Sequence, residues 1–331
     1  MTPSPQTLTR TELACCPVYR EALDFADPAQ LTGIGHGEIY PIVNGIPILL
    51  PDQAERERVS RTDWSNPTAA HNSTDFYNQT QDQEHYYTHY KAGLDATRLE
   101  LDRWLKERRS EGPTLEIGSG RGVLQGVGED YAALDYSFTA LHQFVDPHYP
   151  RFCGTADRLP YRDGTFSFLF TVAALEHVPK ADLAFAEIDR VLKPGGVAFL
   201  HPAWHCVQYN CDGIPVRPYK DLKLRQKLTK IALPLLKHPL FKAAMTLPGR
   251  LARRAIWKLS GGNTVLRFKR LRPDYEHFWI SDADAASSID SHEGCLFFHS
   301  RGYEVLHPGP GAMRQLMCRH VGIVVRKPSS P

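Results

Sequence analysis

The chain has 331 residues, and its 39 lysines and arginines nearly balance 37 aspartates and glutamates, so that the formal net charge is +2. Hydrophobic residues make up 42% of the chain, which is ordinary for a globular protein and argues against intrinsic disorder. The balanced average charge argues against a dedicated nucleic-acid binder. Seven irregularly spaced cysteines indicate a reducing, cytoplasmic setting. We expect neither a secretory signal nor a membrane-spanning helix, because the first residues lack an apolar core and no apolar run of about 18 residues appears.

Residues 1–60 are expected to form a first, small unit. Tyr40 to Pro51 reads YPIVNGIPILLP, in which Asn44-Gly45 separates two short apolar runs. This pattern is typical of a β-hairpin. Residues 61–112 are expected to form a helical connector or lid, with one helix ending before Gly112-Pro113. If this region forms a lid, we expect its helix to carry Tyr86, Tyr87 and Tyr90.

Residues 113–331 are expected to form a third part with an α/β fold. Short apolar runs alternate here with helical patterns, which predicts a parallel sheet with helices on both faces. The region 205–280 interrupts this alternation and is expected to be a helical insertion. No internal repeat is evident.

The sharpest motif is a glycine-rich turn, Glu116-Ile117-Gly118-Ser119-Gly120-Arg121-Gly122, which follows the first predicted strand. Glycines at such a turn allow the backbone to approach a ligand closely. Asp135 ends the next predicted strand, where a carboxylate can accept both ribose hydroxyls of a nucleoside. The glycine spacing weakens a dinucleotide assignment, and the missing Lys-Ser/Thr pair argues against a nucleoside triphosphate.

Residues 113–204 resemble the class I S-adenosylmethionine-dependent methyltransferases of the broad methyltransferase type 11 group. The matching segments are LEIGSGRG (115–122), YAALDYS (131–137), GTADRLPYRDGTFSFLF (154–170), AALEHVP (173–179) and AEIDRVLKPGG (186–196). The resemblance implies a Rossmann-like fold with a mostly parallel seven-stranded sheet, and S-adenosylmethionine as the cofactor. It implies that the cofactor is bound by Glu116, Gly118, Ser119, Gly120, Gly122, Asp135, Tyr136, Thr155, Ala156, Asp157 and Ala173.

Within that set, the resemblance implies that the glycines surround the amino-acid end of the cofactor, Asp135 binds the ribose, and Tyr136 packs on the adenine. The family commonly has Gly-Asp-Ala where this chain has Gly154-Thr155-Ala156. Thr155 stands at the position of that aspartate, and Asp157 follows two residues later. Both therefore remain candidates for contacting the adenine.

Residues 13–51 resemble the small zinc-ribbon-like activator proteins of tRNA methyltransferases, on the segments LACCP and YPIVNGIPILL. A tetrahedral zinc site needs four Cys or His ligands. Cys15, Cys16 and His36 do not supply them at the family's spacing. We therefore expect the fold without the metal, with both cysteines in the core, and no metal site elsewhere in the chain.

Histidines near two strand ends are the candidates for a catalytic base. Methyl transfer to a hydroxyl needs an aligned nucleophile and a proton acceptor, and substrates of open α/β sheets bind beyond the carboxyl ends of the strands. His177 and His201 lie there, with His205 third, and imidazole titrates near neutral pH. In the alternative interpretation, Glu176 and His177 hold the loop at a helix start. Asp282 is a weaker site candidate, since Ser281 and Asp282 also read as a helix N-cap.

The insertion concentrates positive charge. Residues 217–272 carry 16 basic residues and one acid, Asp221, which gives +15, so the remaining residues sum to −13. Four aliphatic residues recur there at helical spacing before and after Pro234, which is expected to interrupt the helix: Leu224, Leu228, Ile231 and Leu235. Such basic amphipathic helices suit anionic membranes, phosphate-bearing substrates or nucleic acid, and otherwise form a solvated cap over the substrate cleft.

The sequence thus predicts a cytoplasmic S-adenosylmethionine-dependent methyltransferase that O-methylates a small-molecule, glycan or lipid-linked acceptor, with an anionic acceptor preferred. Peripheral contact with the inner membrane surface through 217–272 is a further expectation. Nucleic acid is disfavoured as a partner because no stacking aromatic pattern is evident. The alternatives are an RNA or protein methyltransferase, a non-catalytic cofactor-binding scaffold, and a reaction of the cofactor other than methyl transfer. The acceptor atom and the oligomeric state stay open.

Overall fold

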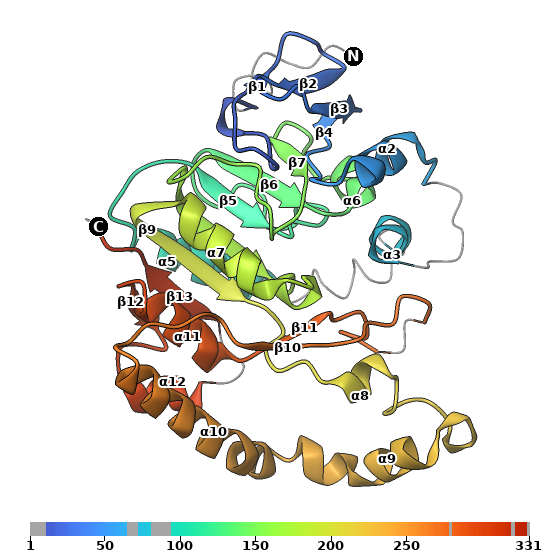
Figure 1. The fold of residues 1–331 in the computed structure, drawn as a ribbon, viewed down its shortest axis with the longest axis vertical. Coiled ribbons are helices and arrows are strands. Elements are labelled where there is room, and N and C mark those ends of the chain that lie inside the picture. Colours follow the sequence, from blue (N-terminus) through green and yellow to red (C-terminus); the bar gives the residue numbers. More distant parts are fainter. Residues whose placement is uncertain (1–10, 65–71, 81–93, 278–279, 319–321, 330–331) are drawn as a thin grey trace. The chain divides into compact units, whose positions relative to one another are not determined.

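A computed structural model of the chain describes residues 11–64, 72–80, 94–277, 280–318 and 322–329 (Figure 1). The chain forms two compact units. Unit 1 comprises Met1–Val172, Leu183–Phe199 and Lys327–Pro331, and unit 2 comprises Ala173–Asp182 and Leu200–Arg326. The predicted lid tyrosines Tyr86, Tyr87 and Tyr90 lie outside the described residues.

The main sheet is mostly parallel, as the sequence predicts, and its seven strands have the order β12-β13-β9-β8-β5-β6-β7. Its strands in unit 1 are β5 (Thr114–Ile117), β6 (Tyr131–Asp135), β7 (Arg151–Cys153), β8 (Phe166–Val172) and most of β9 (Leu192–His201). The parallel partners of β5 are β6, with Thr114 opposite Tyr131, and β8, with Thr114 opposite Phe168. Near-continuous apolar strands are expected where helices cover both faces. Helices α7 (Ala181–Val191) and α5 (Leu94–Leu105) lie on opposite faces (Figure 1).

The N-terminal region of unit 1 is a four-stranded antiparallel sheet, β1 (Leu23–Asp24), β2 (Gln30–Gly33), β3 (Ile39–Val43) and β4 (Ile46–Pro47). The predicted hairpin is confirmed: Asn44 and Gly45 connect β3 to β4, with φ angles of 51° and 75°. Cys15 and Cys16 are fully buried, and the Cys16 thiol lies 3.0 Å from the Tyr40 hydroxyl. Because both cysteines are buried, they serve as core residues. Burial also raises the pKa of Cys15 to about 11.

This N-terminal sheet is attached to the β7 edge of the main sheet. Ile48 forms a parallel bridge with Cys153, and the Leu49 amide donates to the Cys153 carbonyl at 2.7 Å. Arg20 donates to Glu187 at 2.8 Å. Because an exposed strand edge offers unpaired backbone groups, this packing protects β7. Three short helices complete this side of unit 1: α2 (Gln53–Arg61), α3 (Ser73–Thr80) and α6 (Phe138–His142).

Unit 2 contains the predicted insertion and the elements that follow it up to Arg326. Its elements, in addition to the end of β9, are η2 (Leu175–His177), α8 (Gln208–Cys211), η3 (Tyr219–Asp221), α9 (Leu224–Lys237), α10 (Pro239–Leu259), β10 (Phe268–Arg270), β11 (Ser287–Ile289), α11 (Ser291–His299), β12 (Glu304–His307), α12 (Ala312–Met317) and β13 (Ile323–Arg326). β12 and β13 pair antiparallel, as do β10 and β11. Among the described residues, no helix is both long and apolar enough to cross a membrane.

Two local predictions in unit 2 are wrong. Pro234 does not interrupt the helix at its own position but lies inside α9, which ends three residues later at Lys237. Ser281 and Asp282 do not cap a helix, because residues 281–284 form turns. Asp282 has a φ of 62°, a left-handed conformation that a right-handed helix does not accommodate.

Candidate functional site

The glycine loop follows β5 in unit 1, and its backbone adopts conformations that favour glycine. Gly118, Gly120 and Gly122 all have positive φ, at 75°, 53° and 76°, which favours glycine. The Gly118 amide donates to the Leu134 carbonyl of β6 at 2.8 Å. A Cβ on Gly120 would meet nothing within 4 Å, whereas one on Gly122 would lie 2.2 Å from the Phe144 ring. Gly120 therefore faces open space that a ligand can enter, and Gly122 is needed for packing.

Asp135 fixes the loop from the end of β6. One carboxylate oxygen accepts from the Gly120 amide at 2.7 Å, and the other accepts from the Ser137 amide at 2.7 Å. Each carboxylate oxygen can accept more than one hydrogen bond. The side chain thus joins the two segments that the sequence assigns to the cofactor.

Glu116, which the resemblance assigns to the cofactor, lies in the core of unit 1. Its side chain is buried and accepts a hydrogen bond from the Tyr131 hydroxyl of β6. Burial raises the pKa of Glu116 to about 8, against the lowering effect of that hydrogen bond. Its contacts therefore join β5 to β6 beneath the loop.

Tyr136 is held by the N-terminal helices. Its hydroxyl donates to Glu55 of α2 and lies 2.8 Å from the Thr74 hydroxyl of α3, which itself donates to Glu55 at 2.7 Å. The Tyr77 ring packs edge-on against Tyr136 at 6.1 Å. Burial, followed by the Glu55 charge, raises the pKa of Tyr136. No local signal in the sequence marks Glu55 and Thr74, since folding alone brings them to Tyr136.

The third cofactor segment follows β7. The Gly154 amide donates to the Asp135 carbonyl at 2.9 Å. The segment Thr155, Ala156 and Asp157 therefore starts beside Asp135, the candidate for binding the ribose. The Thr155 hydroxyl is buried and has no hydrogen-bond partner among the described residues, whereas the Asp157 side chain is half-buried. A bound water or a ligand can satisfy such a buried hydroxyl. Ala173, at the start of unit 2, has a φ of 48° and donates to the His201 carbonyl at 2.9 Å.

The three candidate bases in unit 2 differ in their surroundings. His177 Nδ1 lies 3.1 Å from Asp284 Oδ2. Burial alone would lower the pKa of His177, but Asp284, Glu176 and Asp282 offset it and raise it to about 10. His177 therefore holds its proton at neutral pH, which counts against it as a base. His205 Nε2 lies 3.0 Å from a nitrogen of the buried Arg250, a contact that occupies the basic lone pair.

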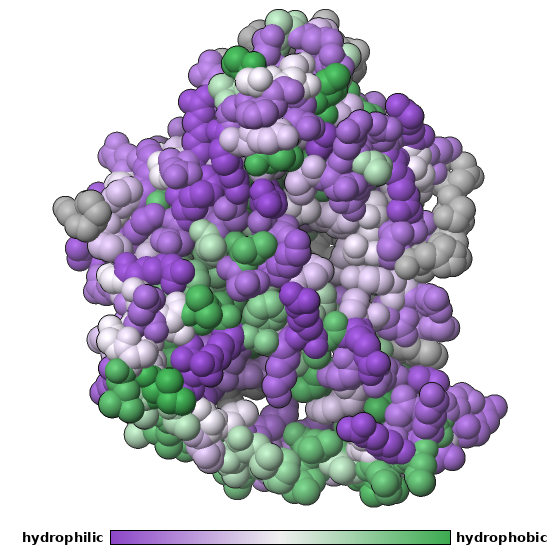
Figure 2. All heavy atoms as spheres, viewed as in Figure 1, coloured by the Kyte–Doolittle hydropathy of each residue, from purple (hydrophilic) through white to green (hydrophobic). Residues whose placement is uncertain are grey.

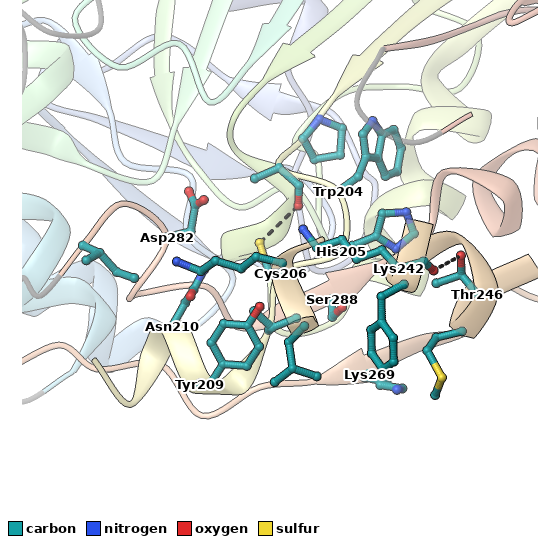
Figure 3. Close-up of a pocket in the computed structure, with 18 of the residues that line it drawn as sticks. Trp204, His205, Cys206, Tyr209, Asn210, Lys242, Thr246, Lys269, Asp282 and Ser288 are labelled. Atoms are coloured by element: carbon teal, nitrogen blue, oxygen red, sulfur yellow. Dashed lines mark hydrogen bonds between the residues drawn. The ribbon is translucent and has the colours of Figure 1, made fainter. Parts of the chain in front are cut away.

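His201 borders a cavity in unit 2 whose volume is about 900 Å³. Figure 3 shows side chains that line this cavity. The cavity is also lined by residues from several elements, among them Trp204, Tyr209, Phe241, Lys242, Lys269 and Asp282. Phe241 and Lys242 come from the insertion helix α10 and Lys269 from β10. Sequence reasoning identified the excess of basic residues in the insertion but not which of them face a cavity.

Comparison with known proteins identifies the region that carries these motifs. Residues 115–200 match the family model of a methyltransferase domain. The chain carries a methyltransferase domain. This match confirms the predicted S-adenosylmethionine-dependent domain and the predicted cofactor.

Individual relatives match parts of the chain. The biotin biosynthesis bifunctional protein BioHC of Cellvibrio japonicus is 30% identical over 118 residues, 33% of this chain and 23% of that protein. A UPF0434 protein of Maricaulis maris is 46% identical over 46 residues, 14% of this chain and 73% of that protein, so over this stretch the chain belongs to the family of that protein. The chain spans about a quarter of the length of the first curated relatives that it matches.

A solved structure of CalS10, an amino pentose methyltransferase from Micromonospora echinaspora with bound cofactor, is also similar. Its TM-score is 0.33 at 20% identity, over 37% of this chain and 57% of that chain.

Proposed function

We propose that this chain is an S-adenosylmethionine-dependent methyltransferase that O-methylates a small-molecule, glycan or lipid-linked acceptor. One observation carries the proposal: Asp135 holds the Gly120 amide at 2.7 Å in a loop that is open at Gly120, inside the matched methyltransferase domain. This arrangement suits the ribose and amino-acid end of the cofactor, because a carboxylate at this strand end accepts ribose hydroxyls.

The cavity of unit 2 is the proposed acceptor site. Trp204 and Tyr209 offer flat apolar faces for a sugar ring, and Lys242 and Lys269 offer positive charge for an anionic group. His201, which borders the same cavity, is the proposed base. These features support an acceptor that combines hydroxyl groups with a negatively charged part.

Cofactor binding tests the proposal through Asp135. We expect calorimetry with S-adenosylmethionine to give saturable binding by the wild type. Asp135→Ala should bind at least about tenfold more weakly, because hydrogen bonds to a charged group contribute about 1.5–3 kcal/mol. Glu129→Gln changes an exposed acid of the same unit and should bind like the wild type. Equal affinity of the wild type and Asp135→Ala would rule out this site.

We further propose that the insertion contacts an anionic membrane surface. Leu224, Leu228, Ile231 and Leu235 of α9 are each more than half exposed, and they recur at helical spacing among basic residues. Figure 2 shows apolar side chains gathered along α9 and α10. An apolar face flanked by lysines and arginines suits the interface of an anionic bilayer. The N-terminal unit is proposed to retain the zinc-ribbon-like fold without the metal.

A further inference from the structure

Three potential metal ligands converge in unit 2 around a buried carboxylate that makes no hydrogen bond of good geometry with any described residue. Glu176 and His177 belong to η2, and Asp282 precedes β11. One ligand atom from each of these three residues lies within 4.8 Å of the others. Two hydrogen bonds tie η2 to the β11 segment: the Ala286 amide donates to the Glu176 carbonyl at 2.9 Å, and the Ser287 hydroxyl donates to the Val178 carbonyl at 2.6 Å.

Glu176 is the observation that indicates a ligand. Its side chain is fully buried, and neither carboxylate oxygen makes a hydrogen bond of good geometry with any described residue, although the amides of Glu176 and Ala203 approach it. His177 Nε2 lies 3.8 Å away, beyond hydrogen-bond distance. Because a buried carboxylate is costly unless it is closely paired or coordinates a metal, a metal cation between these groups would satisfy it more fully than the ion pair with His177 at 3.8 Å.

His177 has the surroundings of a metal-bound histidine. Its Nδ1 lies 3.1 Å from Asp284 Oδ2, while its Nε2 is on the side of Glu176. A carboxylate that holds one ring nitrogen orients the other toward a metal, and this pairing is common in metal sites. Asp284 would therefore be a positioning residue, and Glu176, His177 and Asp282 would be the ligands.

We propose that Glu176, His177 and Asp282 bind a divalent cation. Two carboxylate oxygens and one imidazole nitrogen suit Mn²⁺, which accepts oxygen ligands and also tolerates imidazole. Three protein ligands leave coordination positions open. Asp282 lines the cavity of about 900 Å³ and is drawn among its lining residues in Figure 3, so the proposed ion would lie beside that space. If the protein is the proposed methyltransferase, the ion would polarise an acceptor hydroxyl, and this role rests on the proposed function. Binding of the ion does not depend on that function.

The test titrates the full chain, first treated with chelator, with MnCl₂ in the absence of S-adenosylmethionine. Calorimetry should show a single saturable site. Glu176→Gln and Asp282→Asn should each lower the affinity at least about tenfold, and Asp284→Asn should lower it about 10–100-fold, the range known for residues that orient a ligand. Asp221→Asn changes an exposed acid of the same unit and should leave the affinity unchanged.

Two results would overturn the metal site. One is the absence of saturable Mn²⁺ binding to the wild type, in which case a protonated His177 is the cation of the cluster. The other is equal binding by the wild type and by Asp282→Asn, whose half-buried position makes it the variant least prone to unfold. Circular dichroism checks the folding of each variant. Because Mn²⁺ binding is measured without cofactor, it stands or falls independently of the Asp135 experiment.

Discussion

Two acidic side chains contact the glycine loop and the strand beneath it from opposite sides. Asp135 faces the loop and accepts hydrogen bonds from two amides, whereas Glu116 lies beneath it, buried against Tyr131. The sequence resemblance groups the two acids together. The structure separates them, because strand alternation and burial put the Glu116 carboxylate in the core of unit 1, where its pKa rises to about 8.

Glu116 should make the stability of the protein depend on pH. Its pKa is about 8 in the folded chain against an ordinary value of 4.5, so the folded state binds more protons between these values and its stability falls as pH rises through that window. Glu116→Gln keeps an oxygen for Tyr131 and removes the titration. Urea unfolding should therefore show the variant gaining stability relative to the wild type from pH 5 to pH 8, by up to about 1.4 kcal/mol per unit of pKa difference. Parallel pH profiles of the two proteins would contradict this expectation.

At the scale of elements, helices α2 and α3 are hydrogen-bonded to the two residues that follow Asp135 at the end of β6. Helices α2 and α3 contribute Glu55 and Thr74 to the hydroxyl of Tyr136. In addition, the Ser137 hydroxyl donates to the Tyr77 carbonyl of α3 at 2.8 Å. These contacts give the region before residue 80 a physical role in holding the segment after β6.

Tyr136→Phe should loosen this attachment. The change removes the hydroxyl that donates to the Glu55 carboxylate, and a hydrogen bond to a charged group contributes about 1.5–3 kcal/mol. The free energy of unfolding in urea should fall by about that amount, with the midpoint as the readout. Tyr19→Phe serves as the control, since the Tyr19 ring is 47% exposed. A Tyr136→Phe midpoint equal to that of the control would show that the contact contributes nothing to stability.

Across the whole molecule, charge is distributed unevenly. Residues 217–272 carry +15 and the rest −13, but the structure withdraws part of this charge from the surface. Arg250 is buried and bonded to Asp290 at 2.7 Å, and Arg253 is bonded to Glu293 at 2.8 Å. On α9, four basic residues lie among its exposed apolar side chains: Arg225, Lys227, Lys230 and Lys237.

Vesicle flotation tests whether that stripe contacts membranes. The wild type should float with vesicles containing phosphatidylglycerol and not with pure phosphatidylcholine, and raising the salt should weaken binding because exposed charges are screened. Leu228→Glu combined with Ile231→Glu should reduce flotation severalfold. Leu99→Glu is matched for exposure, at 72%, and should float like the wild type. Flotation that is unaffected by the double change would contradict the proposed contact.

The sequence by itself determined the parts that depend on local order along the chain. The hairpin at Asn44-Gly45, the parallel strands, the buried Cys15 and Cys16, and the glycine loop with Asp135 all follow from turn chemistry, apolar periodicity or motif spacing. The division at residues 60 and 112 and the cytoplasmic location remain predictions. Tertiary structure decided what depends on contacts between distant segments. Asp282 and Asp284 meet His177 from more than 100 residues away in the sequence, and they change its proton affinity through charge and burial that no local pattern encodes.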